Sequence, residues 1–213
     1  MKQKIGVLGG TFDPVHTSHL ELAAAAQSEF NLNRVIFVPS AAPPHKMAAR
    51  VSSFEHRVRM VEIACKLSQT FDCNPLEGQM PAPSYTIDTI KSLLSELGQE
   101  NTLYFIVGCD AFLDILTWKS YREILNLVSI LVSRRKGVDE TELVDLARIL
   151  DYNIIKKSIW SSSKGDKNIH FLKRVPADLS STMIKKYLYN DLIVGKNIPK
   201  KVAEYIRENS LYK

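Results

Sequence analysis

The chain has 213 residues, of which 45% are hydrophobic and 24% are charged, a composition typical of a globular protein with a substantial core rather than a disordered or fibrous one. Its formal charge of +5 is spread along the sequence, and the basic clusters contain no interleaved aromatic residues, which argues against a nucleic-acid partner and suits a small phosphorylated ligand. We expect a cytoplasmic protein without a membrane partner, because there is no apolar run of roughly 20 residues, no signal-peptide pattern and no C-x-x-C pair among the three cysteines.

Strand-like and helix-like segments alternate from the first residues of the chain. Apolar runs predict strands near residues 5–8, 35–38, 103–107 and 127–132, with a further short strand at 72–75. Helical periodicity predicts helices over residues 17–29, 53–68, 86–97 and 139–150. This alternation is typical of a Rossmann-like, doubly wound α/β fold with a mainly parallel sheet.

The remaining segments predict connections and a helical end. Residues 40–53 contain two consecutive prolines and no apolar period, so we expect a loop over the strand ends, where α/β proteins bind ligands. Residues 161–168 are polar and predict a mobile surface connection. From residue 178 onward, two helices separated by Gly195 and Pro199 predict a small C-terminal helical cap. We therefore expect one domain over residues 1–213, with 178–213 as its helical subregion.

The most informative segment follows the first predicted strand. Gly9 and Gly10 permit a close approach of the backbone to a ligand, which suits a nucleotide phosphate. The segment matches neither the P-loop nor the dinucleotide fingerprint G-x-G-x-x-G. His16 and His19 are three residues apart at the start of the next predicted helix, so both imidazoles should lie on one face. Together with the helix N–H groups they form a candidate clamp for phosphate oxygens.

Other readings of the two histidines stay open. One can cap the helix while the other packs against the sheet. Two histidines at i and i+3 can also share a zinc ion, but no third cysteine or histidine stands nearby, so we expect no metal held by side chains alone.

A second candidate anion site lies near the end of the chain. Ser180, Ser181 and Thr182 predict a helix start with hydroxyl capping, followed by Lys185 and Lys186 in the first turns. Capping alone explains the hydroxyls, and solvent explains the lysines. The presence of the first candidate phosphate site favours the interpretation of this segment as a second anion site.

The two segments resemble the two signatures of the nucleotidyltransferases of the HIGH superfamily. They are Gly9-Gly10-Thr11-Phe12-Asp13-Pro14-Val15-His16 with His19, and Ser180-Ser181-Thr182. More narrowly, the chain resembles the bacterial nicotinate-nucleotide adenylyltransferase family from residue 5 to residue 212. The further matching pieces, in chain order, are Pro39, Pro43-Pro44-His45-Lys46, Arg57, Met60, Ser84-Tyr85-Thr86, Gly108, Asp110, Trp118, Ser133-Arg134, Ile198-Pro199, Tyr205-Ile206 and Leu211-Tyr212.

The resemblance implies an activity. ATP would transfer its adenylyl group to nicotinate mononucleotide by in-line attack without a covalent enzyme intermediate, and Mg²⁺ would enter with ATP. The implied catalytic residues are His16, His19 and Lys46. Those implied for ATP are Gly9, Gly10, Thr11, Phe12, His16, His19, Arg134, Ser180, Ser181, Thr182 and Lys185. Those implied for the mononucleotide are Asp13, His45, Lys46, Tyr85, Thr86, Gly108, Asp110 and Trp118, with the helix start at Tyr85 facing the pyridine carboxylate and Trp118 stacking on the ring.

The sequence departs from the family pattern at two positions. Ser18 stands where the family usually has glycine, and Lys185 stands where it usually has arginine, so Lys185 supplies a point charge without a bidentate fork. Two rival functions stay open. One is the same chemistry on phosphopantetheine or nicotinamide mononucleotide, and the other is a nonenzymatic nucleotide sensor, which the retained histidines and Lys46 disfavour. A homodimer or higher homo-oligomer is compatible with the sequence, which does not fix the oligomeric state.

Overall fold

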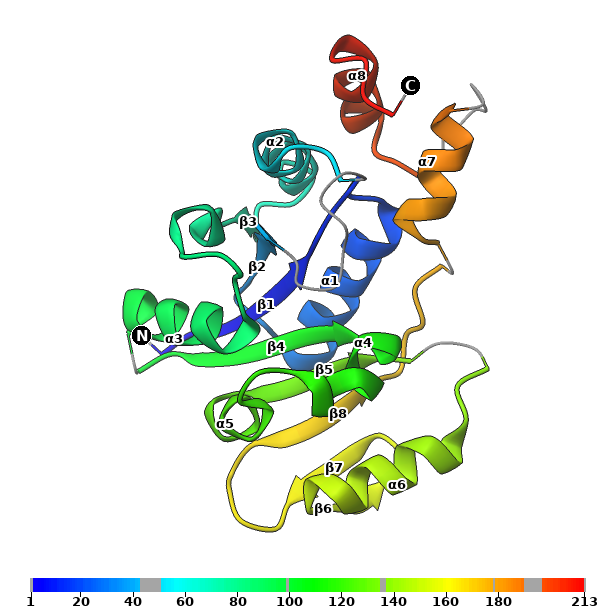
Figure 1. Ribbon diagram of the computed structural model, residues 1–213. Coiled ribbons are helices and arrows are strands. Elements are labelled where there is room, and N and C mark those ends of the chain that lie inside the picture. Colours follow the sequence, from blue (N-terminus) through cyan, green and yellow to red (C-terminus); the bar gives the residue numbers. More distant parts are fainter. Residues whose placement is uncertain are drawn as a thin grey trace.

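A single eight-stranded sheet organises the computed structural model, which describes residues 2–42, 51–98, 100–134, 137–177, 179–189 and 197–212 (Figure 1). The strand order is β3-β2-β1-β4-β5-β8-β7-β6. The strands are β1 (Lys4–Gly10), β2 (Arg34–Pro39), β3 (Phe71–Cys73), β4 (Thr102–Gly108), β5 (Ser129–Ser133), β6 (Tyr152–Lys156), β7 (Ile159–Ser162) and β8 (Asn168–Leu172). Pairing is parallel from β3 across to β8, and only β7 and β6 join antiparallel, which confirms the mainly parallel sheet.

Helices cover both faces of this sheet. They are α1 (Thr17–Phe30), α2 (Phe54–Cys65), α3 (Thr86–Leu97), α4 (Cys109–Leu113), α5 (Tyr121–Leu127), α6 (Glu140–Leu150), α7 (Ser181–Tyr189) and α8 (Lys200–Glu208), with 3-10 turns η2 (Leu76–Gln79) and η3 (Asp114–Thr117). Among the described residues, no helix is long and apolar enough to cross a membrane.

The alternation of side chains along the strands explains the two layers. In β2, Ile36 and Val38 join the core made with α3, α5 and α6, whereas Val35 and Phe37 join the core made with α1, α2, α7 and α8. Successive strand residues point to opposite faces, so a continuous apolar run buries both. The doubly wound α/β class predicted from the sequence is therefore confirmed.

The two C-terminal helices pack on the face that carries α1 and α2. Val202 and Ile206 are four residues apart on α8, so one face of that helix enters the second core, where Ile184 of α7 is also buried. His56 of α2 and the hydroxyl of Tyr205 are hydrogen-bonded at 2.8 Å. Figure 1 shows α7 and α8 beyond the end of β1, beside the start of α1.

The structure corrects several predicted boundaries. The polar segment 161–168 is shorter as a connection than predicted, since residues 161 and 162 belong to β7, residue 168 belongs to β8, and residues 163–167 connect them. The sequence pattern did not predict β6, β7 or β8. In β6, Ile154 and Ile155 are both exposed at the edge of the sheet, so backbone pairing rather than burial defines this strand. Leu127 closes α5 rather than opening β5, and α2 ends at Cys65.

Candidate functional site

The two histidines at the start of α1 stack on each other. His16 precedes the helix in an extended conformation, and its ring centroid lies 3.7 Å from that of His19, with 31° between the ring planes. Both imidazoles thus lie on one face, as their spacing predicts. The backbone N–H of His16 donates to Nδ1 of His19 at 3.2 Å. Because Nδ1 accepts this bond, a neutral His19 ring carries its proton on Nε2.

His16 is held as a neutral imidazole. Its side chain is only 3% exposed, and burial lowers its pKa from 6.5 to about 4. Its Nδ1 atom is buried without a hydrogen-bond partner among the described residues. The two histidines form a capping box at the start of α1, in which the His16 side chain faces the backbone N–H of His19, so this Nδ1 atom is turned toward the helix start.

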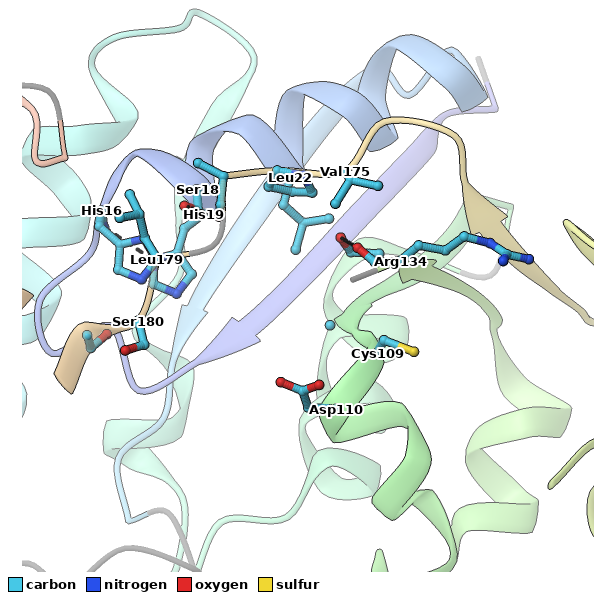
Figure 2. Close-up of a pocket in the computed structure, with 15 residues that line it drawn as sticks. His16, Ser18, His19, Leu22, Cys109, Asp110, Arg134, Val175, Leu179 and Ser180 are labelled. Atoms are coloured by element: carbon cyan, nitrogen blue, oxygen red, sulfur yellow. Dashed lines mark hydrogen bonds between the residues drawn. The ribbon is translucent and has the colours of Figure 1, made fainter. Parts of the chain in front are cut away.

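A cavity of about 550 Å³ adjoins the stacked pair, and we call it the histidine pocket (Figure 2). It is lined by His16, Ser18, His19, Leu22, Gly108, Cys109, Asp110, Ser133, Arg134, Val175, Pro176, Ala177, Leu179, Ser180 and Ser181. These residues come from the start of α1, from the ends of β4 and β5, and from the chain that leads into α7. Parallel strands deliver their carboxyl ends to one edge of a sheet, which is the usual ligand-binding edge of α/β proteins.

Residues of α1 form hydrogen bonds with the segment that leads into α7. The hydroxyl of Ser18 donates to the carbonyl of Ala177 at 2.8 Å, and the N–H of Ala177 donates to Glu21 at 3.0 Å. The hydroxyl of Ser181 donates to the carbonyl of Pro14 at 3.2 Å. The serine at the family's usual glycine position therefore makes a specific bond that glycine could not make.

The start of α7 matches the predicted capped helix. The Ser180 hydroxyl accepts a hydrogen bond from the N–H of Met183 at 3.2 Å. Ser180 and Ser181 line the histidine pocket, whereas Thr182 is exposed and lies outside its lining.

Arg134 lines the same pocket but its guanidinium is engaged elsewhere. It pairs with Glu140 at 2.9 Å, lies 5.0 Å from the ring centroid of Phe171 and donates to the carbonyl of Lys157. Figure 2 shows the side chain pointing away from His16 and His19. Its expected contact with a triphosphate stays a prediction and requires this guanidinium to turn.

Asp13 and Lys185 pair with each other. Asp13 is 2% exposed and accepts hydrogen bonds from Lys185 Nζ at 2.8 Å, the Tyr212 hydroxyl at 2.7 Å and the Ser52 N–H at 3.3 Å. Burial raises the pKa of Asp13, but these bonds outweigh it and the pKa is lowered. Neither Asp13 nor Lys185 is among the residues that line the two pockets, so their implied ligand roles are not what this geometry favours.

A second cavity of about 610 Å³, which we call the tryptophan pocket, brings together Tyr85, Thr86 and Trp118. Its lining comprises Val7, Gly9, Gly10, Thr11, Ser40, Glu77, Ser84, Tyr85, Thr86, Thr89, Phe105, Val107, Ala111, Asp114, Thr117, Trp118 and Lys119. Trp118 is half-buried and meets Phe105 edge to face at 6.0 Å between ring centroids. Lys119 Nζ lies 4.3 Å from the ring centroid of Tyr85 and pairs with Asp88 at 3.0 Å. The pocket thus combines aromatic walls with a cation at Tyr85.

The structure divides the predicted ligand residues differently from the resemblance. Gly9, Gly10 and Thr11, expected at ATP, line the tryptophan pocket, whereas Gly108 and Asp110, expected at the mononucleotide, line the histidine pocket. Helix α4 contributes to both pockets, since Asp110 lines one and its neighbour Ala111 lines the other.

Phe12 packs against the ring of His19. It is buried, its ring meets that of His19 edge to face at 5.0 Å, and it lines neither pocket. A Cβ atom at Gly10 would lie 3.0 Å from the Phe12 ring, so this glycine allows the aromatic ring to pack against the backbone. His45 and Lys46 lie outside the described residues.

Arg57 matches the family pattern, but the sequence predicts no role for it. Its guanidinium is buried and donates to the carbonyls of Thr11 at 2.9 Å, Ser40 at 2.6 Å and Ser52 at 3.0 Å. Thr11 and Ser40 both line the tryptophan pocket, so Arg57 fixes part of its wall. An arginine within an amphipathic helix looks like a solvated residue in sequence, and only its burial identifies this function.

The family model, the curated relatives and the solved structures that match this chain agree on its family. The cytidylyltransferase-like family model matches residues 7–187. A probable nicotinate-nucleotide adenylyltransferase of Desulfotalea psychrophila is 32% identical over 212 residues, covering 99% of this chain and 100% of the relative. A protein of the same name from Geotalea uraniireducens is 36% identical, covering 98% of each. The solved structure of the Plasmodium falciparum nicotinic acid mononucleotide adenylyltransferase complexed with NaAD has the same fold, with a TM-score of 0.73 at 20% identity over 99% of this chain and 97% of that one. The chain therefore belongs to the nicotinate-nucleotide adenylyltransferase family.

Proposed function

We propose that this protein transfers the adenylyl group of ATP to nicotinate mononucleotide, giving nicotinate adenine dinucleotide and pyrophosphate, a step of NAD biosynthesis. The observation that carries the proposal is a stacked pair of histidines at a helix start, on a pocket that adjoins a second pocket with aromatic walls. The names of the relatives and the dinucleotide bound in the Plasmodium falciparum structure support it.

The reaction needs charge stabilisation rather than a nucleophilic side chain. A phosphate oxygen of the mononucleotide attacks the α-phosphorus of ATP, and the bond from that phosphorus to the oxygen bridging the β-phosphate breaks in line, so that pyrophosphate leaves. His16 and His19 donate N–H groups to the non-bridging oxygens on which negative charge develops. Each such donor contributes about 2.7–4 kcal/mol to transition-state stabilisation. The positive end of the α1 dipole adds to this effect.

We assign the histidine pocket to ATP. The Ser180 hydroxyl and the N–H groups at the start of α7 offer donors to the phosphates, whereas the Ser181 hydroxyl is engaged with Pro14. Gly108 allows the backbone to approach the nucleotide, and the carboxylate of Asp110 suits ribose hydroxyls, which donate hydrogen bonds.

We assign the tryptophan pocket to the mononucleotide. Helix α3 begins at Thr86, and its cap residue Tyr85 supplies no side-chain hydrogen bond, so the helix start suits the carboxylate of nicotinate. Trp118 stacks on the pyridine ring in this assignment, and Lys119 adds positive charge nearby. Gly9, Gly10 and Thr11 form the wall that joins this pocket to the reacting phosphate.

Nucleotidyltransferases of this kind generally use a divalent metal. Within the described ranges, no group of three or more histidine, cysteine, aspartate or glutamate residues could hold a metal ion. Mg²⁺ commonly binds through substrate phosphates, water and one or two carboxylates, and Asp110 lines the pocket assigned to ATP, so the residues present fit a metal that arrives with ATP. We propose Mg²⁺, which would neutralise charge on the pyrophosphate.

The other expectations from the sequence are kept as proposals. We propose that residues 1–213 act as one domain, because Leu8 of β1 and Val202 of α8 lie in the same core. Free thiols at Cys65, Cys73 and Cys109 suit a reducing cytoplasm. Roles of His45 and Lys46 at the phosphates, the absence of a nucleic-acid partner and a homodimer or higher homo-oligomer stay predictions.

A panel of acceptors tests the function directly. Purified protein is incubated with ATP and Mg²⁺ and with nicotinate mononucleotide, nicotinamide mononucleotide or phosphopantetheine, and products are identified by mass. We expect nicotinate adenine dinucleotide as the main product. Equal turnover of the acid and the amide would remove the acid preference. ATP binding without any product would favour the nucleotide sensor.

A further inference from the structure

Glu77 is a buried carboxylate in the wall of the tryptophan pocket. It lies in η2, is 8% exposed and accepts three hydrogen bonds. The Ser84 hydroxyl donates to Oε2 at 2.6 Å, the Thr89 hydroxyl donates to Oε1 at 2.7 Å, and the N–H of Ala41 donates to Oε2 at 3.2 Å. One side chain therefore joins the exit of β2, the turn before α3 and the first turns of α3.

All three of these donors are neutral. Burying a carboxylate is costly, and the three hydrogen bonds, together with the nearby cation of Arg57, offset that cost. Hydrogen bonds to an ionised acceptor are shorter and roughly twice as strong as those between neutral groups, which makes the arrangement of Ser84 and Thr89 rigid. An amide at this position would offer one acceptor oxygen in place of two.

The donors are themselves parts of the pocket. Ser84 and Thr89 line it on the α3 side, and Ser40, the neighbour of Ala41, lines it on the β2 side. Because the Ser84 hydroxyl donates to Glu77, the carboxylate also fixes the turn that presents Tyr85 at the start of α3. This carboxylate therefore links the two walls, while Arg57 separately fixes Thr11 and Ser40.

We propose that Glu77 is a positioning residue for the acceptor: it sets the spacing between the β2 exit and the start of α3, and so the affinity for the mononucleotide, without touching the reacting atoms. The proposal rests on the proposed function only for the chemical identity of the acceptor. The wall spacing itself is a property of this chain.

The main test is the split between two Michaelis constants. Glu77→Gln keeps the volume and removes one acceptor oxygen, so the KM for nicotinate mononucleotide should rise about tenfold while the KM for ATP and kcat stay within about twofold. Glu77→Ala should raise the acceptor KM further. The amide variant then acts as a partial rescue, which a role in bulk packing alone would not give.

The partners should act through Glu77. Ser84→Ala and Thr89→Val each remove one donor and should each raise the acceptor KM. Added to Glu77→Gln, Ser84→Ala should change that KM by less than about twofold, because residues that share one hydrogen-bond network are not additive.

A matched control separates positioning from stability. Leu143→Ala removes a buried side chain from α6, which contributes to neither pocket lining, and it should lower Tm while leaving both KM values unchanged. The proposal is overturned if Glu77→Gln behaves like this control, or if it raises the KM for ATP as much as that for the acceptor.

One readout does not depend on catalysis. The amide proton of Ala41 donates to Glu77, so its exchange with solvent should be faster in Glu77→Gln than in the wild type. Unchanged exchange at Ala41 overturns the proposal whatever the acceptor is. If the wild type instead uses another acceptor from the panel, the proposed function fails, and the KM for that acceptor takes the place of the KM for nicotinate mononucleotide.

Discussion

Two buried carboxylates, Asp13 close in sequence to the stacked histidines and Glu77 in the wall of the tryptophan pocket, are held by different kinds of hydrogen-bond partner. Asp13, beside the histidine pocket, has a cationic partner in Lys185, 172 positions away, and a hydroxyl partner in Tyr212, 199 positions away. Glu77, in the tryptophan pocket, uses neutral donors no more than 36 positions away. The partners of Asp13 therefore come from the C-terminal end of the chain, whereas the partners of Glu77 come from residues near it in sequence.

Because of this difference, we expect mutations at Asp13 and its partners to change stability, and mutations around Glu77 to change substrate specificity. A buried ion pair that loses one member leaves an uncompensated charge, so the histidine side should respond to mutation mainly through unfolding. Local hydrogen bonds around Glu77 shape a pocket wall, so the tryptophan side should respond mainly through acceptor binding.

The largest expected effect comes from breaking the ion pair. Lys185→Met should lower the free energy of unfolding by about 3 kcal/mol, because it leaves the Asp13 carboxylate buried without its cation. Urea unfolding measures this, and Lys201→Met, at an exposed lysine of α8, should change stability by no more than about 0.5 kcal/mol. If Lys185→Met instead keeps its stability and raises the KM for ATP, then Lys185 binds the triphosphate, as the family resemblance implies.

Removing a histidine tests the chemical step on the same side. His16→Ala should lower kcat by about 100- to 1,000-fold with a modest change in ATP affinity, because its hydrogen bond strengthens as charge develops on the phosphate. Single-turnover kinetics and ATP titration measure the two quantities. Unchanged turnover would reject the phosphate clamp.

The corresponding change on the tryptophan side should move affinity rather than rate. Trp118→Ala should raise the KM for the mononucleotide by about 5- to 10-fold, because it removes one aromatic face from the ring site. Steady-state kinetics with ATP saturating measures it. A variant that unfolds without a specific KM effect would show that Trp118 only packs against Phe105.

The comparison also explains which features could be predicted from the sequence. His16 and His19 lie within one turn of one helix, so their shared face follows from spacing alone. The pairing of Lys185 with Asp13 joins residues from opposite ends of the chain, and no local pattern predicts it. Arg134 is similar in part, because its guanidinium lies against Phe171 of β8, although its ion-pair partner Glu140 is close in sequence.

The assignment of residues to pockets depends on geometry in the same way. Gly9 and Gly10 are close to the histidines in sequence. At the end of a strand, however, the pocket that a residue lines depends on how that strand is aligned with the adjacent strands. Gly10 pairs with Pro39 of β2, which directs this segment toward the tryptophan pocket, lined also by Ser40. The sequence could therefore predict that these glycines lie at a candidate ligand site, but not which pocket they line.

The smallest expected effect is the pH response of His16, and it tests whether burial really keeps this residue neutral. Burial lowers its pKa from 6.5 to about 4, so the imidazole stays uncharged across pH 6–8 and its protonation should not lower kcat in that range. A kcat profile between pH 5 and 8 measures this, with the residual activity of His16→Ala as its control. An acid limb with a midpoint near 6.5 that persists in His16→Ala belongs to another group. A limb that disappears in this variant would mean that His16 titrates as an exposed imidazole, and then the donor that faces the phosphate would be a cation whose strength changes with pH.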